Sequence, residues 1–210
     1  MAGPLLETKL HVPRLRRALV ARTRLSERLS RGTESALTLV SAPAGFGKTT
    51  LLTGWLAAAP ADRRSAAWLS LDQPDNDPAR FWTYLIAAQQ SAAPGVGEGA
   101  VSLLHSPQAP IEAVLATLLN DLSALSNDVV LVLDDYHVID SRDIQDGMIF
   151  LLEHLPPQVH LVIASRADPA LPLPRLRAPG QLVASPAAGL RSPPAAAAEP
   201  PTHSVGLALA

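Results

Sequence analysis

The chain has 210 residues, of which 48% are hydrophobic, and it carries a formal net charge of −2. That much apolar sequence can bury one α/β core but hardly two, and the small net charge excludes a general attraction to nucleic acid or anionic membranes. The lack of cysteine excludes disulfides and thiol catalysis, and because no apolar run has the length of a signal peptide or membrane span, we expect a soluble cytoplasmic protein.

The first 32 residues are expected to be helical. Leucines recur there at roughly helical spacing with arginines between them, which predicts one amphipathic helix or two short ones. These leucines are Leu15, Leu19, Leu25 and Leu29. The arginines fit a solvated helix face, which the acidic balance of the whole chain favours, and a nucleic-acid contact is the alternative.

The most informative segment is Ala42–Thr49, with the sequence Ala-Pro-Ala-Gly-Phe-Gly-Lys-Thr, which directly follows the apolar run 36–40. A strand, a Gly-rich turn and a helix in this order match the phosphate-binding loop, in a relaxed form because Ala42 stands where Gly is commoner. Successive backbone N–H groups of such a turn point at a bound phosphate. The segment therefore predicts a site for a nucleoside triphosphate.

Two side chains of this loop have expected roles of their own. Lys48 is expected to reach the outer phosphates, and its position in a chain that otherwise uses arginine, apart from Lys9, favours a point-charge role. The Thr49 hydroxyl is placed to ligate Mg²⁺. The predicted nucleotide-binding residues are Ala42, Pro43, Ala44, Gly45, Phe46, Gly47, Lys48, Thr49 and Thr50.

Apolar, strand-like runs alternate with helical stretches along most of the chain. The strands are expected at 36–40, 66–71, 129–133 and 159–164, and the helices at 49–59, 78–90, 111–125 and 144–155. Asp77 is the expected N-cap of the second of these helices, with Pro78 at its first position. Near-continuous apolar strands between helices are typical of a parallel sheet covered on both faces. We therefore predict an α/β fold, the three-layer sandwich of a P-loop NTPase with a mostly parallel sheet.

A second half of the site is expected where the run 129–133 ends in Asp134 and Asp135. Asp134 is expected to hold Mg²⁺ beside the loop, and Asp135 to orient or deprotonate an attacking water. The alternative for this pair is an acidic cap after a buried strand. Arg166 follows the next strand, where open α/β sheets bind ligands, so it is expected to contact the γ-phosphate; the alternative is an ordinary surface arginine.

Several other polar or aromatic residues are expected to lie outside the chemistry. His137 is assigned a packing or supporting role, because the six histidines show no metal-ligand spacing and Mg²⁺ prefers oxygen. Trp55, Trp68 and Trp82 are expected in the core. Asp72 lies near the carboxyl edge of the predicted sheet and is a candidate to border the site.

From about residue 178 the composition changes to Ala, Pro and Ser. The segment 181–183 is a candidate edge strand, and prolines beyond it break any long periodic element, which predicts a disordered or loosely attached tail. The expected organisation is a helical segment over 1–32, a P-loop NTPase domain over 33–180, and an Ala/Pro-rich tail over 181–210.

Together these residues resemble the nucleotide-binding domain of the signal-transduction NTPases (STAND class), in particular the large LuxR-type regulators similar to the maltose-regulon activator. The segments that carry the resemblance are Thr8–Leu10 with Pro13, Ser41–Thr50, Trp68–Phe81, Leu133–His137 and Leu161–Gly180. It implies an ATP/ADP switch in which Lys48 and Thr49 bind phosphate and metal. It also implies that Asp134 and Asp135 serve Mg²⁺ and slow hydrolysis, that Arg166 senses the γ-phosphate, and that adenine contacts lie near 20–22.

Regulators of this family continue into winged-helix, sensor and DNA-binding domains, which 210 residues cannot hold. The chain is therefore expected to be a truncated NTPase domain that binds ATP and Mg²⁺, self-associates on ATP binding, and does not contact DNA by itself.

Three functions remain open on the sequence. The leading one is a nucleotide switch with slow or no hydrolysis. A small ATPase or kinase would turn over rapidly or phosphorylate an acceptor, and it would need an Arg-bearing lid that does not stand out between 71 and 111. An inert remnant of a truncated or frame-shifted gene would aggregate through unpaired strand edges and apolar surface.

Overall fold

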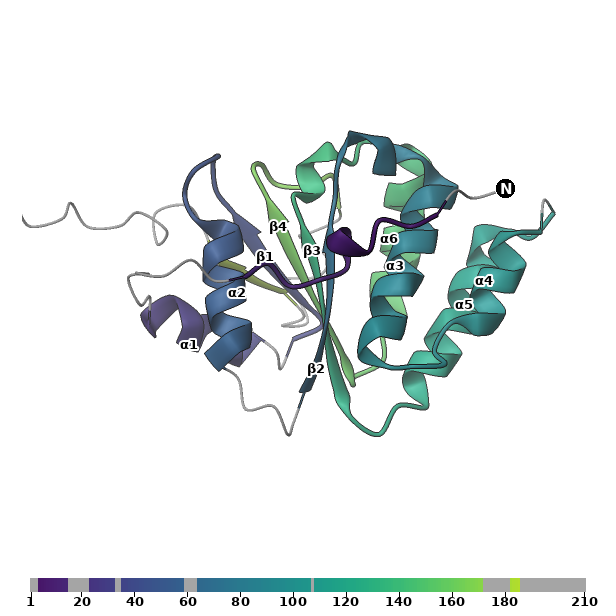
Figure 1. The fold of residues 1–210 in the computed structure, drawn as a ribbon, viewed down its shortest axis with the longest axis horizontal. Helices are drawn as coiled ribbons and strands as arrows, with labels where there is room; N and C mark the ends of the chain where they lie inside the picture. Colours follow the sequence, from purple (N-terminus) through teal and green to yellow (C-terminus); the bar gives the residue numbers. More distant parts are fainter. Residues whose placement is uncertain are drawn as a thin grey trace, which may run out of the picture.

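Parallel strands form the centre of the computed structural model, which describes residues 4–14, 23–32, 35–58, 64–106, 108–171 and 182–185. The strands are β1 (Leu37–Ser41), β2 (Arg64–Ser70), β3 (Asp128–Asp134), β4 (Val159–Ser165) and β5 (Leu182–Ser185). They make one five-stranded sheet in the order β2-β3-β4-β1-β5, and every pairing is parallel. All carboxyl ends therefore lie at the same edge of the sheet (Figure 1).

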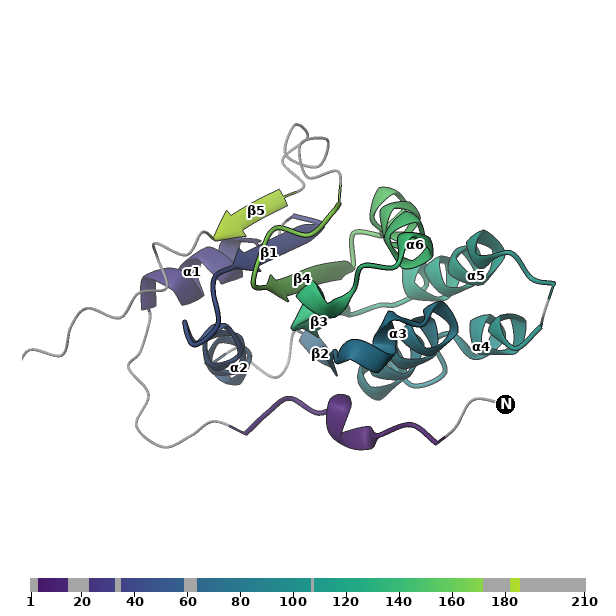
Figure 2. The ribbon, with the colours of Figure 1, turned by 90° about the horizontal axis from the view of Figure 1, so that it is seen from above.

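Helices cover both faces of the sheet, as Figures 1 and 2 show from two directions. On one face lie α1 (Thr23–Gly32) and α2 (Lys48–Ala58). On the other lie α3 (Pro78–Ala92), α5 (Ile111–Ser123) and α6 (Arg142–Glu153), with the short α4 (Glu98–Leu104) against α3 and α5. The predicted α/β three-layer sandwich of a P-loop NTPase is confirmed.

Successive residues of the inner strands face opposite layers. On β3, Leu131 and Leu133 belong to the core under α3, α5 and α6, whereas Val130 and Val132 belong to the core under α1 and α2. Side chains of a strand alternate between its two faces, and both faces are covered here. This double burial is why the strand sequences are apolar without interruption.

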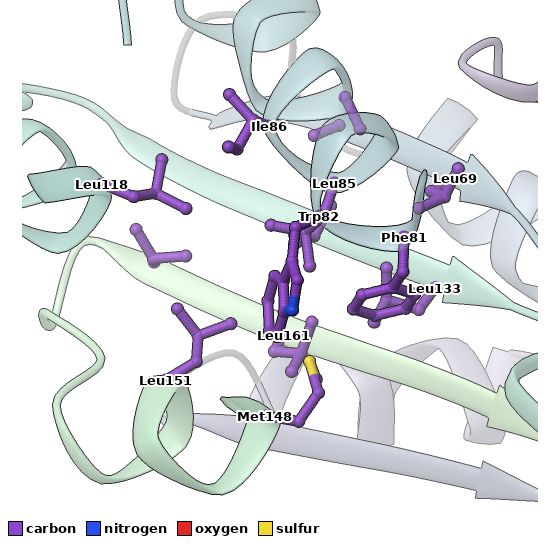
Figure 3. Close-up of a cluster of buried hydrophobic side chains, with 14 of the residues drawn as sticks. Leu69, Phe81, Trp82, Leu85, Ile86, Leu118, Leu133, Met148, Leu151 and Leu161 are labelled. Atoms are coloured by element: carbon purple, nitrogen blue, oxygen red, sulfur yellow. The ribbon is translucent and has the colours of Figure 1, made fainter. Parts of the chain in front are cut away.

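The larger of the two cores lies between the sheet and α3, and Figure 3 shows its centre. Phe81 and Trp82 of α3 meet edge to face with ring centroids 4.9 Å apart. Trp82 also contacts α6 at Gly147, where a Cβ atom would lie only 2.5 Å from the indole ring. The smaller core holds Trp55 and Trp68, so the prediction that all three tryptophans are core residues is confirmed.

The expected strands and helices are present, with ends that differ by a few residues. Asp77 caps α3, because its Oδ1 accepts a hydrogen bond from the Arg80 N–H at 2.9 Å. The candidate edge strand exists as β5, which pairs with β1. Helix α4 and three 3-10 turns were not expected: η1 (Glu7–Lys9), η2 (Gln73–Asn76) and η3 (Tyr136–Val138). The predictions for residues 15–22 and for the tail over 186–210 lie outside the described residues.

The N-terminal segment 4–14 runs across the β2 edge of the sheet and beside α3 (Figures 1 and 2). The Leu6 N–H donates to the Tyr84 hydroxyl at 2.9 Å, and the Lys9 ammonium pairs with Asp72 at 2.9 Å and with Asp75. These contacts hold the segment against the domain. Within the described part of the chain, no helix is long and apolar enough to cross a membrane.

Candidate functional site

The loop between β1 and α2 has the backbone of an anion-binding turn. Gly45 and Gly47 have a left-handed backbone, with φ of 81° and 73°. Residues other than glycine rarely adopt this conformation. A Cβ on Gly45 would meet nothing within 4 Å, so the backbone angle rather than crowding requires glycine there. The loop leads directly into α2, whose N-terminal N–H groups and helix dipole favour a bound anion.

Lys48 is buried at the first position of α2, with only 6% of its surface exposed. Its ammonium donates to two carbonyls of its own loop, Ala42 O at 2.7 Å and Pro43 O at 3.2 Å. Carbonyl oxygens satisfy the hydrogen bonds of the ammonium but leave its charge uncompensated. The loop therefore presents a net positive charge beside its N–H groups.

Two oxygen ligands of the type that Mg²⁺ prefers lie together at the end of the loop. The Thr49 hydroxyl, in the first turn of α2, donates to Oδ2 of Asp134, the last residue of β3, at 2.7 Å. Burial is the main cause that raises the pKa of Asp134 above its ordinary value, and the hydrogen bond from Thr49 opposes this shift. A buried carboxylate gains from a nearby cation, so the donor set fits a hard metal ion.

Asp135 follows β3 in a left-handed conformation, with φ of 58° and ψ of 35°. Non-glycine residues in this region are uncommon and mark turns or functional sites. The His137 Nδ1 atom lies 3.6 Å from Asp135 Oδ1, which is too long for a hydrogen bond. Burial, and then the charge of Arg166, lower the pKa of His137, so the imidazole is neutral at neutral pH and the contact is not an ion pair.

These elements surround a cavity of about 300 Å³ at the carboxyl edge of the sheet. Its lining comes from the ends of three strands: the loop after β1, Asp135 after β3 and Arg166 after β4. In full, the lining residues are Ala44, Gly45, Gly47, Lys48, Thr49, Thr50, Asp135 and Arg166. Loop N–H groups, two cations and one carboxylate around one cavity match the chemistry of a polyphosphate.

Comparison with known proteins gives the lineage of this site. The chain is 39% identical over 180 residues to the HTH-type transcriptional regulator MalT of Yersinia pestis (strain Pestoides F). MalT of Yersinia enterocolitica (serotype O:8 / biotype 1B) matches with the same identity and length. The chain carries a MalT-like P-loop NTPase domain. The match takes in 85% of this chain and 20% of the relative, so the chain spans a small part of the curated proteins that it resembles.

No protein-family model matches the chain. Among solved structures, Drosophila ORC bound to AT-rich DNA and Cdc6 matches the MalT-like domain with a TM-score of 0.50, over 78% of this chain and 52% of that chain. The identity is 12%, so this likeness concerns the fold alone.

The MalT-like domain brings most of the predicted site residues together, but not all of them. Ala42 is buried where its N–H donates to the Ser165 carbonyl, and Pro43 is exposed. Phe46 packs against the smaller core. These three do not line the cavity and contribute to the shape of the loop. Asp72 does not line it either, because its carboxylate pairs with Lys9.

Sequence reasoning gave no role to Asp75 or Asn76 in the segment between β2 and α3, and this segment reaches the site through hydrogen bonds. The Leu71 N–H donates to the Asp134 carbonyl at 3.0 Å. The Asn76 side chain accepts hydrogen bonds from the N–H groups of Asp140 and Ser141, which follow η3. The available signal was a cluster of aspartates and one asparagine in an otherwise apolar stretch, together with the lone Lys9 near the start of the chain.

Proposed function

We propose that this domain binds ATP with Mg²⁺ and acts as the nucleotide switch of a STAND-class, LuxR-type transcriptional regulator in the cytoplasm. The similarity to MalT supports the regulatory context, because MalT is named as a transcriptional regulator. The cavity supports the ligand. The observation that carries the proposal is the meeting of Lys48, Asp135 and Arg166 around the Gly-rich loop.

Different groups of the loop are proposed to bind different parts of the triphosphate. The N–H groups from Gly45 to Thr49 are proposed to cradle the inner phosphates, as helix N-termini and Gly-rich loops do. Lys48 exchanges its carbonyl partners for the outer phosphates, which bring the counter-charge that the carbonyls lack. Thr49 and Asp134 would hold Mg²⁺, which neutralises part of the phosphate charge when it is bound.

Hydrolysis of the bound nucleotide is proposed to be slow or absent, as suits a switch. Asp135 is assigned the role of orienting the attacking water and Arg166 that of contacting the γ-phosphate. The neutral His137 next to Asp135 cannot attract that carboxylate as an imidazolium would. Asp135 therefore stays free to face the cavity.

The partners of the domain follow from the same proposal. ATP binding is proposed to favour self-association, and the contact of a complete regulator with DNA is assigned to a separate domain. The alternatives are a small ATPase or kinase and an inert remnant. They differ from the switch in turnover and in binding, so one set of measurements separates them.

The proposal is tested by isothermal titration of the full chain with ATP–Mg²⁺ and with ADP, for the wild type and for Lys48→Ala. Loss of charge-assisted hydrogen bonds to phosphate is expected to weaken binding by roughly 10- to 100-fold. Arg142→Ala is the matched control, because it removes one positive charge from an exposed side chain of α6.

Each outcome selects one function. Binding that only Lys48→Ala weakens supports the switch, and rapid turnover of ATP in the same samples would favour an ordinary ATPase or kinase. Soluble wild-type protein that binds neither nucleotide would reject the proposal and favour the inert remnant.

A further inference from the structure

Asn76, at the end of η2, ties together two loops at the carboxyl edge of the sheet. Its Oδ1 accepts hydrogen bonds from the N–H groups of Asp140 at 2.9 Å and Ser141 at 2.8 Å. Its Nδ2 donates to the Asp140 carboxylate. The amide thus uses both of its ends on one short segment, which is the link between η3 and α6.

This link is the far end of the turn that begins at Asp135. The Val138 N–H donates to the Asp135 carbonyl at 3.2 Å, and the Ile139 N–H to the Tyr136 carbonyl at 3.0 Å. Within the turn, the buried Tyr136 ring packs edge to face on Phe81 at a centroid distance of 6.5 Å. The turn is therefore continuous and hydrogen-bonded from the left-handed Asp135 to the position that Asn76 holds.

Asn76 is itself held in place by the residue before it. Asp75 is fully buried and accepts hydrogen bonds from the Lys9 ammonium, from Arg80 Nε at 3.0 Å and from the Asp72 N–H at 2.9 Å. Three donors around one buried carboxylate leave η2 little freedom. The N-terminal segment, through Lys9, thereby fixes the loop from which Asn76 reaches.

We infer that Asn76 is a positioning residue for nucleotide hydrolysis, because it fixes the turn that aims Asp135 at the cavity. The inference rests on the function proposed above and adds a residue that does not itself line the cavity. A left-handed aspartate needs support from its surroundings to keep that conformation. Asn76 supplies this support from another segment of the chain, 64 residues away from Asp140 in sequence.

The test compares single-turnover hydrolysis of ATP–Mg²⁺ with ATP affinity in the full chain. Asn76→Ala removes all three hydrogen bonds, and we expect hydrolysis to slow by roughly 10- to 100-fold, as for other small misplacements of reacting groups, with ATP affinity unchanged. Asn76→Asp keeps the two acceptor bonds but turns the amide donor into a second carboxylate beside Asp140. Its hydrolysis rate should lie between those of the wild type and Asn76→Ala.

Rescue separates positioning from a general loss of structure. In Asn76→Asp/Asp140→Asn the donor and acceptor are exchanged, and most of the lost hydrolysis rate should return. Asn120→Asp, on an exposed position of α5, adds the same charge elsewhere and should leave the rate unchanged.

Other outcomes would overturn the inference. These are an unchanged rate in Asn76→Ala, a parallel loss of affinity and rate, or no recovery in the exchanged pair. A wild-type chain that binds ATP but never hydrolyses it would reject the role of Asn76 and leave the binding proposal standing. A chain that binds no nucleotide would reject both.

Discussion

The only two lysines of this chain are both buried, and their surroundings differ in kind. Lys9 pairs with the carboxylates of Asp72 and Asp75, and its ammonium lies 4.5 Å from the centre of the Tyr84 ring. The Lys48 ammonium donates hydrogen bonds to carbonyls of its own loop. One buried cation forms ion pairs with carboxylates, and the other is hydrogen-bonded to neutral carbonyls.

This difference separates a structural role from a binding role. A buried lysine with two carboxylates has its counter-charge permanently and gains little from a ligand. A buried lysine that faces carbonyls keeps a net charge that an anion can compensate, and carbonyls are neutral partners that it can leave. Burial of a lysine therefore does not by itself indicate a binding site; the type of its partners does.

The strongest way to test this contrast is Lys9→Met. The change removes the main counter-charge of the fully buried Asp75, and breaking a buried ion pair from one side costs about 3–5 kcal/mol in free energy of unfolding. Urea unfolding followed by circular dichroism measures this cost. Lys48→Met is the matched control and should cost much less, because its departure leaves no buried carboxylate unpaired.

A second variant shows where the cost of Lys9→Met arises. Lys9→Met/Asp75→Asn has no unpaired buried carboxylate, so it should recover a large part of the lost stability. Equal destabilisation by Lys9→Met and Lys48→Met would contradict the contrast between the two lysines.

The dependence of the free energy of unfolding on acid pH tests the ion pairs around Asp75 again, with a smaller expected effect. Burial would raise the pKa of Asp75, but hydrogen bonds from Lys9, from the Asp72 backbone and from Arg80 outweigh burial and lower it. A carboxyl whose pKa is lowered by folding contributes stability above its unfolded pKa, and this contribution is lost as the pH falls through the folded value. We expect stability to decline as the pH falls below the ordinary value of 3.8.

Urea unfolding at neutral pH and at pH values below 3.8 measures this loss of stability. Asp75→Asn cannot titrate at this position, so its stability should depend less steeply on acid pH than that of the wild type. The same acid slope in both proteins would show that other carboxyls dominate this pH dependence.

The sheet and the phosphate-binding loop were predictable because their signals are local. A Gly-rich turn after an apolar run and two aspartates at the end of another depend on neighbours in sequence, and parallel strands then bring Asp135 and Arg166 to one edge. The left-handed glycines of the loop follow from the same pattern. Helix α4 was missed because it has only seven residues and follows a left-handed Gly97 rather than a standard cap.

The support around the site was not predictable because its partners are far apart in the chain. Lys9 and Asp75 are separated by 66 positions, and Asn76 and Ser141 by 65. Nothing in the local sequence assigns Asp72 to Lys9 rather than to the site that it was expected to border. The first pairing depends on packing of the N-terminal segment on the domain, and the second on packing of η2 against the link before α6. A periodic sequence pattern encodes neither.

The smallest expected effect concerns Asp134, a buried carboxylate that forms no salt bridge with any of the described residues. The pKa of Asp134 is raised, mainly by burial, so the ionised form destabilises the folded domain at neutral pH. Asp134→Asn removes that charge and can still accept the Thr49 hydroxyl bond. We expect a higher Tm, by ~2–4 °C for each kcal/mol gained, measured by thermal unfolding without nucleotide, together with a loss of the Mg²⁺ dependence of ATP binding.

Asp135→Asn is the matched control for this change. Its side chain is 45% exposed, and asparagine tolerates the left-handed backbone as well as aspartate does, so its Tm should stay close to that of the wild type. A lower Tm for Asp134→Asn would mean that the ionised carboxylate stabilises the domain through Thr49 and Lys48. A higher Tm with lost metal dependence would mean that the domain gives up stability at Asp134 to keep a charge that a bound cation compensates.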